Sequence, residues 1–336
     1  MHVCEAPEAA AWDAFLVAQP YSPFLQSWTM GEVYRDSGEE PVRLEIREGD
    51  ELVGICQALI VPARRGRHLA IPYGPVLRNE NEREQTMQLL VRALRDVATD
   101  HRCSFLRFSP FWPMGTEPIP GTKPAPLHLL AEHVWLLRLK GKTEEELLAG
   151  MRQNHRNLIR RAQREGVSVT ASQNPNEDIE EFFRLYEETR RRHHFVPYPA
   201  DFIRAQVRRF AADGACTLYL ARYQEETIAA SVHMHFGGET SYHHGASSLV
   251  HPKIPASYAL QWQAIRDAIA RGDHLFNFWG ISPEGVKNHP FAGVRTFKTG
   301  FGGEILELVH CCDLPLNPSY MFTRTFETIR KWRRGF

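Results

Sequence analysis

The two halves of the chain repeat one pattern of elements. The stretches RLEIREGDELVGICQALIV, from Arg43, and LYLARYQEETIAASVHMHF, from Leu218, each contain an apolar strand, a short polar turn and a second, alternating strand. Aligning Arg47 with Arg222 gives an offset of 175 residues, with no gap through the turn. Because this offset is close to half of the 336 residues, we predict two copies of one domain, each built around such a hairpin.

The elements around the two hairpins support this duplication. An amphipathic helix is expected before each hairpin, and a second helix and a buried strand ending in Ser-Pro are expected after it. In chain order these elements are Trp12–Phe15 and onward, Glu84–Thr99 and SFLRFSP from Ser104, and then Ile179–Phe195, Ser257–Arg271 and LFNFWGISP from Leu275. The repeated order of helix, hairpin, helix and strand predicts an α+β fold with mixed sheets. It is the order typical of acetyltransferase-like (GNAT-like) domains.

A proline-rich segment, Pro118–Pro126, separates the halves, and an expected strand at His133–Leu139 opens the second. Near the end of the chain, Tyr320–Trp332 has the apolar spacing of an amphipathic helix. We therefore predict three regions: a first domain at residues 1–130, a second at 131–316, and a terminal helical segment at 317–336.

A helical pattern with a basic face follows the strand that opens the second half. Thr143 and Glu146 form a capping box, and apolar spacing continues from Leu147 until Gly166 stops the run. The opposite face carries Arg152, Arg156, Arg160, Arg161 and Arg164. Such a row suits contact with phosphate groups, and a solvated helix face explains it nearly as well.

Charge and composition exclude several classes of protein. Forty Lys and Arg balance forty Asp and Glu, so binding to nucleic acid or to an anionic membrane must come from a local patch, and we predict no DNA partner. The first residues lack the basic and apolar regions of a signal peptide, and no apolar run reaches the roughly eighteen residues of a membrane span, which predicts a cytoplasmic location. Six cysteines without a CxxC pair predict reduced thiols.

Four histidines raise the question of a metal. His233 and His235 share one face of an expected strand, and His243 and His244 lie on the next. Glu239, in the turn between these strands, is the only acidic residue nearby. Histidines that line a polar cleft therefore explain the pattern better than ligands of a metal ion, and we predict no metal.

The chain lacks the loop that acetyl-coenzyme A requires. Such a site needs backbone N–H groups on the pyrophosphate, in the connection between the hairpin sheet and the next helix. In the second half this connection, SSLVHPKIPASYALQW from Ser247, has no glycine, and Pro255 removes one N–H donor. The corresponding IPYGPVLRNENE of the first half is equally unlike a phosphate loop. We therefore predict no coenzyme A and no other cofactor.

Five segments in order carry a family resemblance: IPYGPV from Ile71, MRQNHRNLIRRAQREGV from Met151, YEETRRRHHF from Tyr186, YHHGAS from Tyr242 and GVRTFKTGFGGE from Gly293. Through them the chain resembles the Fem (FemABX) peptidoglycan aminoacyltransferases from about Phe24 to Tyr320. The resemblance implies two GNAT-like domains and a C-terminal helix that returns to the first of them. The short connection from Val167 to Ile179 resembles the compact members of the family, which lack a coiled-coil arm.

The resemblance also implies a reaction and its partners. Members of the family transfer an amino acid from aminoacyl-tRNA to the amine of a peptidoglycan-precursor peptide. The acceptor is a UDP-linked or a lipid-linked precursor, and a lipid-linked acceptor implies peripheral contact with the membrane. An aminoacyl ester is already activated, so the enzyme mainly positions the reactants and stabilises the tetrahedral oxyanion without ATP.

Lys298 is the candidate catalytic residue. It stands between Phe297 and Phe301, just before Gly302 and Gly303. By itself this pattern leaves open a solvated turn lysine and an ammonium in an aromatic-walled site. The family resemblance implies the second, with the ammonium stabilising the oxyanion.

The remaining expected site residues also come from the resemblance. It implies substrate contacts by Phe297, Arg192, Tyr242, Tyr34 and Arg35, and it favours tRNA contacts by Arg152, Arg156, Arg160 and Arg161. An exposed helix charge at Arg192 and a core position for Tyr242 remain open. The chain departs from the family at three places: Tyr34 and Arg35 stand where a lysine is common, and Ser109 and Asn277 stand where acidic residues are common. The last two departures remove candidate general bases.

Two other functions remain open. An acyl-coenzyme A N-acyltransferase would fit a GNAT-like fold, although the missing phosphate loop argues against it. A non-catalytic tRNA-binding or scaffold protein would fit the missing carboxylates.

Overall fold

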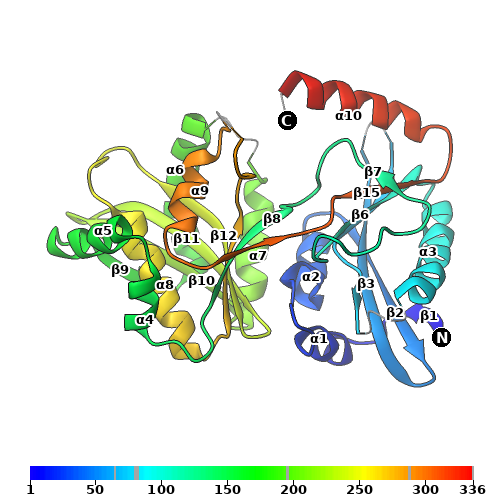
Figure 1. Ribbon diagram of the computed structural model, residues 1–336, viewed down its shortest axis with the longest axis horizontal. Helices are drawn as coiled ribbons and strands as arrows, with labels where there is room; N and C mark the ends of the chain where they lie inside the picture. The colour runs from blue at the N-terminus through cyan, green and yellow to red at the C-terminus, as the bar shows by residue number, and fades with distance from the viewer. Residues whose placement is uncertain (64–65, 79–82, 194–196, 287–288, 335–336) are drawn as a thin grey trace. The chain divides into compact units, whose positions relative to one another are not determined.

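The computed structural model describes residues 1–63, 66–78, 83–193, 197–286 and 289–334 (Figure 1). The chain forms two compact units, one of residues 1–132 with 307–336 and the other of residues 133–306. Each unit has a mixed sheet with helices, so the predicted α+β class is confirmed. Residues 307–316, which the sequence prediction placed in the second domain, lie with the first unit because their strand pairs with it.

The first unit contains an eight-stranded sheet. In spatial order its strands are β1 (His2–Glu5), β2 (Glu40–Glu48), β3 (Glu51–Val61), β4 (His68–Tyr73), β6 (Phe105–Pro110), β15 (Cys312–Pro315) and β7 (Lys123–Pro124), while β5 (Val76–Leu77) pairs with β3. Only β4 and β6 run parallel among the pairs recorded in the described residues. The helices of this unit are α1 (Ala9–Val17), η1 (Phe24–Gln26), α2 (Trp28–Asp36), α3 (Arg83–Asp100) and α10 (Tyr320–Arg334).

The second unit has a seven-stranded sheet. Its spatial order is β14 (Glu304–Glu307), β8 (His133–Arg138), β13 (Leu275–Gly280), β12 (Glu239–Ser247), β11 (Glu226–Phe236), β10 (Cys216–Tyr223) and β9 (Ser168–Ala171). Strands β12 and β13 are parallel. The helices are α4 (Glu144–Gly150), α5 (Gln153–Arg164), α6 (Pro175–His193), α7 (Ala200–Ala212), α8 (Ala256–Arg271) and α9 (Ala292–Thr299).

The structure confirms the internal repeat. Strands β3 and β11 begin at Glu51 and Glu226 and end at Val61 and Phe236, at the offset that the sequence alignment gave. Both hairpins also change register at the aligned positions, just before Arg47 and just before Arg222. The alternating strands and their short polar turns therefore encode the same bulged hairpin twice.

Helical spacing explains how each core forms. In α3 the buried residues Met87, Leu90, Leu94 and Ala98 follow one another at intervals of three or four and pack against the first sheet. In α8 the corresponding buried stripe is Leu260, Ala264, Ile265 and Ala268, which joins the second core. In the part of the chain that the structure describes, no helix combines the length and apolar character that crossing a bilayer requires.

The structure corrects one local prediction. The helical run that begins after the Thr143 capping box is broken, because Met151 adopts an extended conformation between α4 and α5. Lys298 lies in the last turn of helix α9. The expected end of another helix at Phe195 lies outside the described residues.

Candidate active site

Two bulges distort neighbouring strands of the second sheet. In β12 the register skips His243, since Tyr242 faces His233 and His244 faces Val232. In β13 the register shifts between Asn277 and Gly280, and Trp279 takes a positive φ of 65°. The Asn277 side-chain oxygen accepts the Trp279 N–H at 2.8 Å, which holds this unusual backbone in place.

Two aromatic side chains meet beside these bulges. The rings of His243 and Trp279 meet edge to face, with centroids 5.0 Å apart. Bulges beside binding sites re-aim side chains and free backbone groups. The carbonyl of Gly280, directly after Trp279, is such a group, and it accepts a hydrogen bond from Lys298.

Lys298 is buried, with 8% of its surface exposed. Its Nζ donates to the Gly280 carbonyl oxygen at 2.8 Å and lies 5.4 Å from the centroid of the Tyr242 ring, within cation–π range. Burial lowers the pKa of the Lys298 ammonium to about 7. The side chain is therefore a dehydrated amine that gains or loses its proton near neutral pH, and the solvated-turn alternative is wrong.

Tyr242 forms the wall behind this amine. His233 stacks on its ring at a centroid distance of 5.3 Å. The Tyr242 hydroxyl lies over Gly245, where a Cβ would overlap it, so the glycine of YHHGAS is required for this packing. Burial raises the pKa of Tyr242 to about 12, so the ring stays neutral.

The glycines after Lys298 allow close backbone approach. Gly302 and Gly303 have φ values of 84° and 104°, and a Cβ on Gly303 would overlap the Leu136 carbonyl. The Trp135 indole N–H donates to the Gly302 carbonyl at 2.7 Å. The glycine pair therefore fixes the end of α9 against strand β8.

His155 fastens the other side of α9. A ring nitrogen of His155 lies 2.9 Å from the Phe297 carbonyl oxygen, and the Arg152 N–H donates to the Gly300 carbonyl at 2.9 Å. The His155 ring also occupies the space that a side chain on Gly300 would need. These contacts, which sequence reasoning missed, give the physical reason for the break between α4 and α5.

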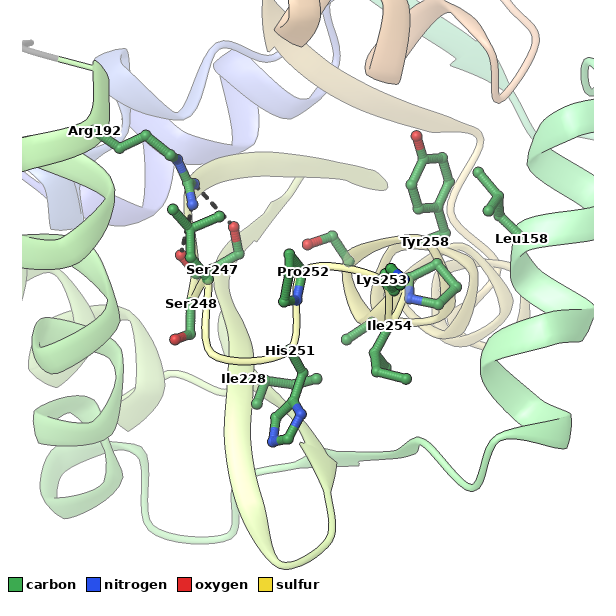
Figure 2. Close-up of a pocket in the computed structure, with 14 residues that line it drawn as sticks. Leu158, Arg192, Ile228, Ser247, Ser248, His251, Pro252, Lys253, Ile254 and Tyr258 are labelled. Atoms are coloured by element: carbon green, nitrogen blue, oxygen red, sulfur yellow. Dashed lines mark hydrogen bonds between the residues drawn. The ribbon is translucent and has the colours of Figure 1, made fainter.

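The Phe297 side chain lies next to a pocket of about 300 Å³, which is drawn in Figure 2. Its ring meets Tyr258 edge to face at 5.1 Å, and Tyr258 lines the pocket. Arg192, on α6, lines the same pocket and donates to Ser247, through Nη1 to the carbonyl (3.3 Å) and through Nη2 to the hydroxyl (3.1 Å). The structure thus brings Lys298, Phe297, Tyr242 and Arg192 together in one unit.

Of the four histidines, His233 and His244 are buried, and His235 and His243 are half-buried. Burial lowers the pKa of each, to about 3 for His235 and His244. Gln206 bridges two of them, since its side chain contacts His243 at 3.2 Å and His244 at 2.9 Å. Within the described ranges, no three His, Cys, Asp or Glu side chains gather as a metal site requires.

Both halves of the chain are similar to known protein families. Residues 8–123 match the model of the FemAB family, and residues 149–291 match that of the acetyltransferase (GNAT) domain. Aminoacyltransferase FemA of Staphylococcus epidermidis is 35% identical over 94 residues. The structure of FemX aligns with a TM-score of 0.83 at 16% identity, over 97% of this chain and 100% of that one.

The chain is therefore similar to Fem family proteins in part of its sequence and in its fold. The FemX alignment and the GNAT-domain match also confirm the predicted tandem GNAT-like architecture. The structure of L-PGS from Bacillus licheniformis shares the fold, with a TM-score of 0.58 at 17% identity over 98% of both chains. The aligned segment with FemA covers 28% of this chain and 22% of FemA.

The four arginines expected to bind tRNA differ in their surroundings. Arg156 donates to the carbonyls of Ala149 (3.0 Å) and Met151 (2.8 Å), so it caps the end of α4. Arg161 pairs with Glu165 at 2.7 Å, four residues further along α5. Arg152 and Arg160 are exposed. The two exposed arginines are therefore the better candidates for contact with an external phosphate.

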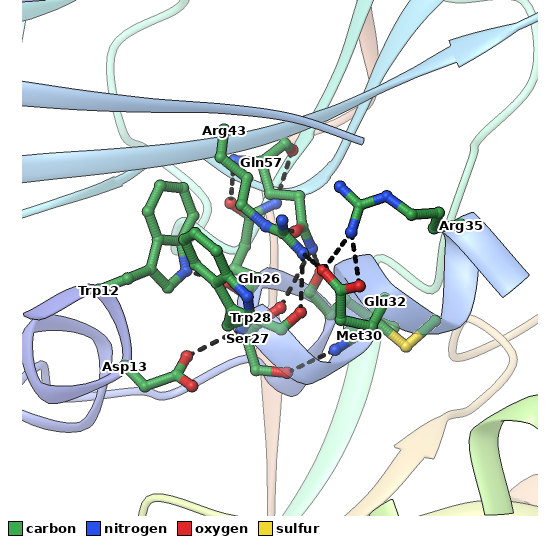
Figure 3. A network of polar contacts seen from close by, with 11 residues as sticks. Trp12, Asp13, Gln26, Ser27, Trp28, Met30, Glu32, Arg35, Arg43 and Gln57 are labelled. Atoms are coloured by element: carbon green, nitrogen blue, oxygen red, sulfur yellow. Dashed lines mark hydrogen bonds and ion pairs between the residues drawn. The ribbon is translucent and has the colours of Figure 1, made fainter. Parts of the chain in front are cut away.

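Tyr34 and Arg35 lie in the first unit, on α2. Tyr34 is buried, and Arg35 is exposed and pairs with Glu32 at 2.6 Å. Glu32 also accepts from the buried Arg43 at 2.7 Å, so Arg35 lies at the edge of a larger polar network (Figure 3).

Sequence reasoning did not find that network. The buried Gln26 donates to the carbonyls of Gln57 (3.0 Å) and Pro72 (2.7 Å), and it accepts the Gln57 N–H. The Gln57 side chain in turn accepts from Arg43 at 3.1 Å. The residues of this network lie on α2, β2, β3 and β4 as well as at Gln26, so no local sequence pattern predicts their contacts. The one available signal was Gln26 directly after the apolar residues Phe24 and Leu25.

The two positions that lack a carboxylate are both buried in strands. The Asn277 side-chain oxygen accepts the Trp279 backbone N–H, and Ser109 lies inside β6. Neither offers a carboxylate base, as the sequence indicated.

Proposed function

We propose that this protein belongs to the Fem family and transfers an amino acid from aminoacyl-tRNA to the amine of a peptidoglycan-precursor peptide. Similarity to aminoacyltransferase FemA supports the reaction class. The observation that carries the proposal is the buried Lys298 amine, which lies on the Gly280 carbonyl and beside the Tyr242 ring. A positive charge in this dehydrated position stabilises an oxyanion far better than one in water.

In the proposed reaction the acceptor amine attacks the carbonyl carbon of the aminoacyl ester. A C–N bond forms, and the C–O bond to the tRNA ribose breaks. The proton that the amine loses ends on the leaving ribose oxygen, directly or through water, because positions 109 and 277 supply no carboxylate. Lys298 stabilises the intermediate oxyanion, and no nucleotide is hydrolysed.

The pocket that includes Arg192 is the proposed site for an anionic group of the precursor. Arg192 and Lys253 supply positive charge there, and Ser248 and His251 supply polar groups. A guanidinium suits a phosphate or carboxylate because its N–H groups match two oxygens at once. Substrate contacts by Phe297, Tyr242, Tyr34 and Arg35 remain part of the same proposal, for a UDP-linked or a lipid-linked acceptor.

The GNAT-domain match favours a second candidate, transfer of an acyl group from coenzyme A. The connection that would bind its pyrophosphate runs from β12 to α8, contains no glycine and places Pro255 at the helix N-cap. Mass spectrometry of precursor peptide incubated with charged tRNA or with acetyl-coenzyme A separates the two. Product with charged tRNA alone supports the proposal, product with coenzyme A alone replaces it, and no product with either points to a binding protein.

The pH dependence tests the charge state of Lys298. Its ammonium is present below a pKa of about 7 and is lost as pH rises through that value. If the ammonium stabilises the oxyanion, the rate constant under saturating substrates should fall above about pH 7. Lys298→Ala should lack this falling limb, and so should Lys298→Arg, whose guanidinium stays charged. Rate constants measured from pH 6 to 8.5 check this. If the rate constant instead rises with pH in the wild type and not in the variants, Lys298 acts as a base.

Two exposed arginines of the α5 region, Arg152 and Arg160, test tRNA binding. Arg152→Ala/Arg160→Ala should weaken binding of charged tRNA and reduce the slope of log affinity against log salt by about 1.5, since each phosphate contact contributes about 0.7 to 0.9. Filter binding at several salt concentrations measures this. The control is Arg92→Ala/Arg95→Ala, which removes two exposed arginines of α3. Equal slopes in the two double variants would assign the α5 arginines to a solvated face.

A further inference from the structure

Helix α10 carries large apolar side chains on its solvent side. The exposed fractions are 56% for Met321, 77% for Phe322, 46% for Ile329 and 82% for Trp332. Helical spacing places Ile329 and Trp332, which are three residues apart, on the same side of the helix as Phe322. Phe322 and Trp332 are the most exposed large hydrophobic residues of the described chain. Clustered exposure of this kind marks an interaction surface, whereas single exposed apolar residues need no explanation. We call these four residues the outer face of α10.

The opposite side of α10 is already occupied by the first unit. Glu327 pairs with Arg107 of β6 at 2.7 Å, and Tyr320 is buried against Phe105 with ring centroids 5.1 Å apart. Arg324 donates to the Pro124 carbonyl at 3.0 Å. These contacts hold the helix in one rotation, so the outer face remains directed to solvent.

Helix α10 is strongly basic. The segment Tyr320–Arg334 contains five basic residues and one acidic residue, a formal net charge of +4, whereas the whole chain has a net charge of zero. The acidic residue, Glu327, is engaged by Arg107. Arg330, Lys331 and Arg333 follow one another around the last turns, beside Trp332.

We infer that the outer face of α10 docks the protein on an anionic lipid surface. Aromatic and aliphatic side chains enter the headgroup boundary while Lys and Arg contact the anionic headgroups, and the helix lies flat on the bilayer. A second copy of the chain fits the face poorly, because paired α10 helices would bring two +4 charges together. RNA would use the basic residues but would leave Phe322, Ile329 and Met321 in water. The inference concerns binding alone and holds whether or not the proposed transfer occurs.

Sedimentation of the full chain with vesicles tests the inference. We expect binding to vesicles of equal parts phosphatidylcholine and phosphatidylglycerol, and at least about tenfold weaker binding to phosphatidylcholine alone, since each basic residue near the surface contributes about fivefold. Phe322→Ser/Trp332→Ser should lower affinity for the anionic vesicles by at least about tenfold. The control Val17→Ser/Met114→Ser, which removes two exposed apolar residues elsewhere in the first unit, should bind as the wild type does.

Both double variants should keep the melting temperature of the wild type, because the changed side chains are exposed. No binding to anionic vesicles, or equal binding by Phe322→Ser/Trp332→Ser, would overturn the inference. It is also overturned if that variant instead abolishes a concentration-dependent dimer of the wild type, or loses affinity for tRNA while its vesicle binding is unchanged.

Discussion

Lys298→Ala should slow amino-acid transfer by about a hundredfold or more and leave the affinities for donor and acceptor nearly unchanged. The physical reason is that the ammonium acts on an oxyanion that exists only in and around the transition state. Loss of one such donor costs on the order of 3 kcal/mol. Lys298→Arg should restore little activity, because a planar guanidinium is wider than the compact ammonium that donates to Gly280 beside the Tyr242 ring.

Rate constants and Michaelis constants of the two variants distinguish the roles of Lys298. If Lys298 instead contacts a substrate phosphate, Lys298→Ala should raise the Michaelis constant, and Lys298→Arg should have a Michaelis constant close to that of the wild type. The matched control is Lys142→Ala, which removes an exposed lysine of the same unit and should be silent. Thermal melting of each variant detects misfolding, and full activity in Lys298→Ala would end the catalytic proposal.

Arg107→Ala should destabilise the first unit by about 3 to 5 kcal/mol. The Arg107 guanidinium binds Asp313 in two places, at 2.7 and 2.9 Å, and also binds Glu327. Asp313 is fully buried, so removal of the arginine would leave a carboxylate without its counter-ion. Because these residues join β6, β15 and α10, the change should also loosen the terminal helix.

Urea unfolding measures this cost, and hydrogen exchange in α10 reports the loosening. In Arg107→Ala/Asp313→Ala the stranded charge is removed, so the double variant should lose less stability than the sum of the two single variants. Arg138→Ala is the control, since Arg138 and Glu304 form an exposed pair with 62% and 55% of their side chains accessible, which should contribute at most about 1 kcal/mol. A loss in Arg107→Ala as small as that of the control would contradict the assigned role.

Part of the candidate site followed from sequence and part did not. The residues that the family resemblance pointed to in the second half, Lys298, Phe297, Tyr242 and Arg192, lie around one region of one unit. The sequence could not separate Arg156, which caps α4, from Arg160, which is exposed, because both occupy the same basic face in the pattern. Which arginine meets a carbonyl depends on where the preceding helix ends.

The amino-acid sequence by itself determined the duplicated architecture. Apolar alternation and short polar turns specify the hairpins of β2–β3 and β10–β11, and stripes at intervals of three or four specify α3, α8 and α10. Each of these signals is local, since the residues that carry it are neighbours along the chain. For this reason the α+β class and the repeat could be predicted without any knowledge of long-range contacts.

Tertiary structure alone decided the features that depend on distant partners. Gln26 meets Gln57 across 31 residues, and Arg107 meets Asp313 across 206, which also places β15 in the first unit. The break before α5 depends on the backbone of Gly300, and the partner of Lys298 depends on a bulge in β13. Buried polar groups must find partners wherever the fold brings them. Periodicity along the chain indicates which side of a helix or strand is buried. It does not indicate which distant atom a buried polar group will contact.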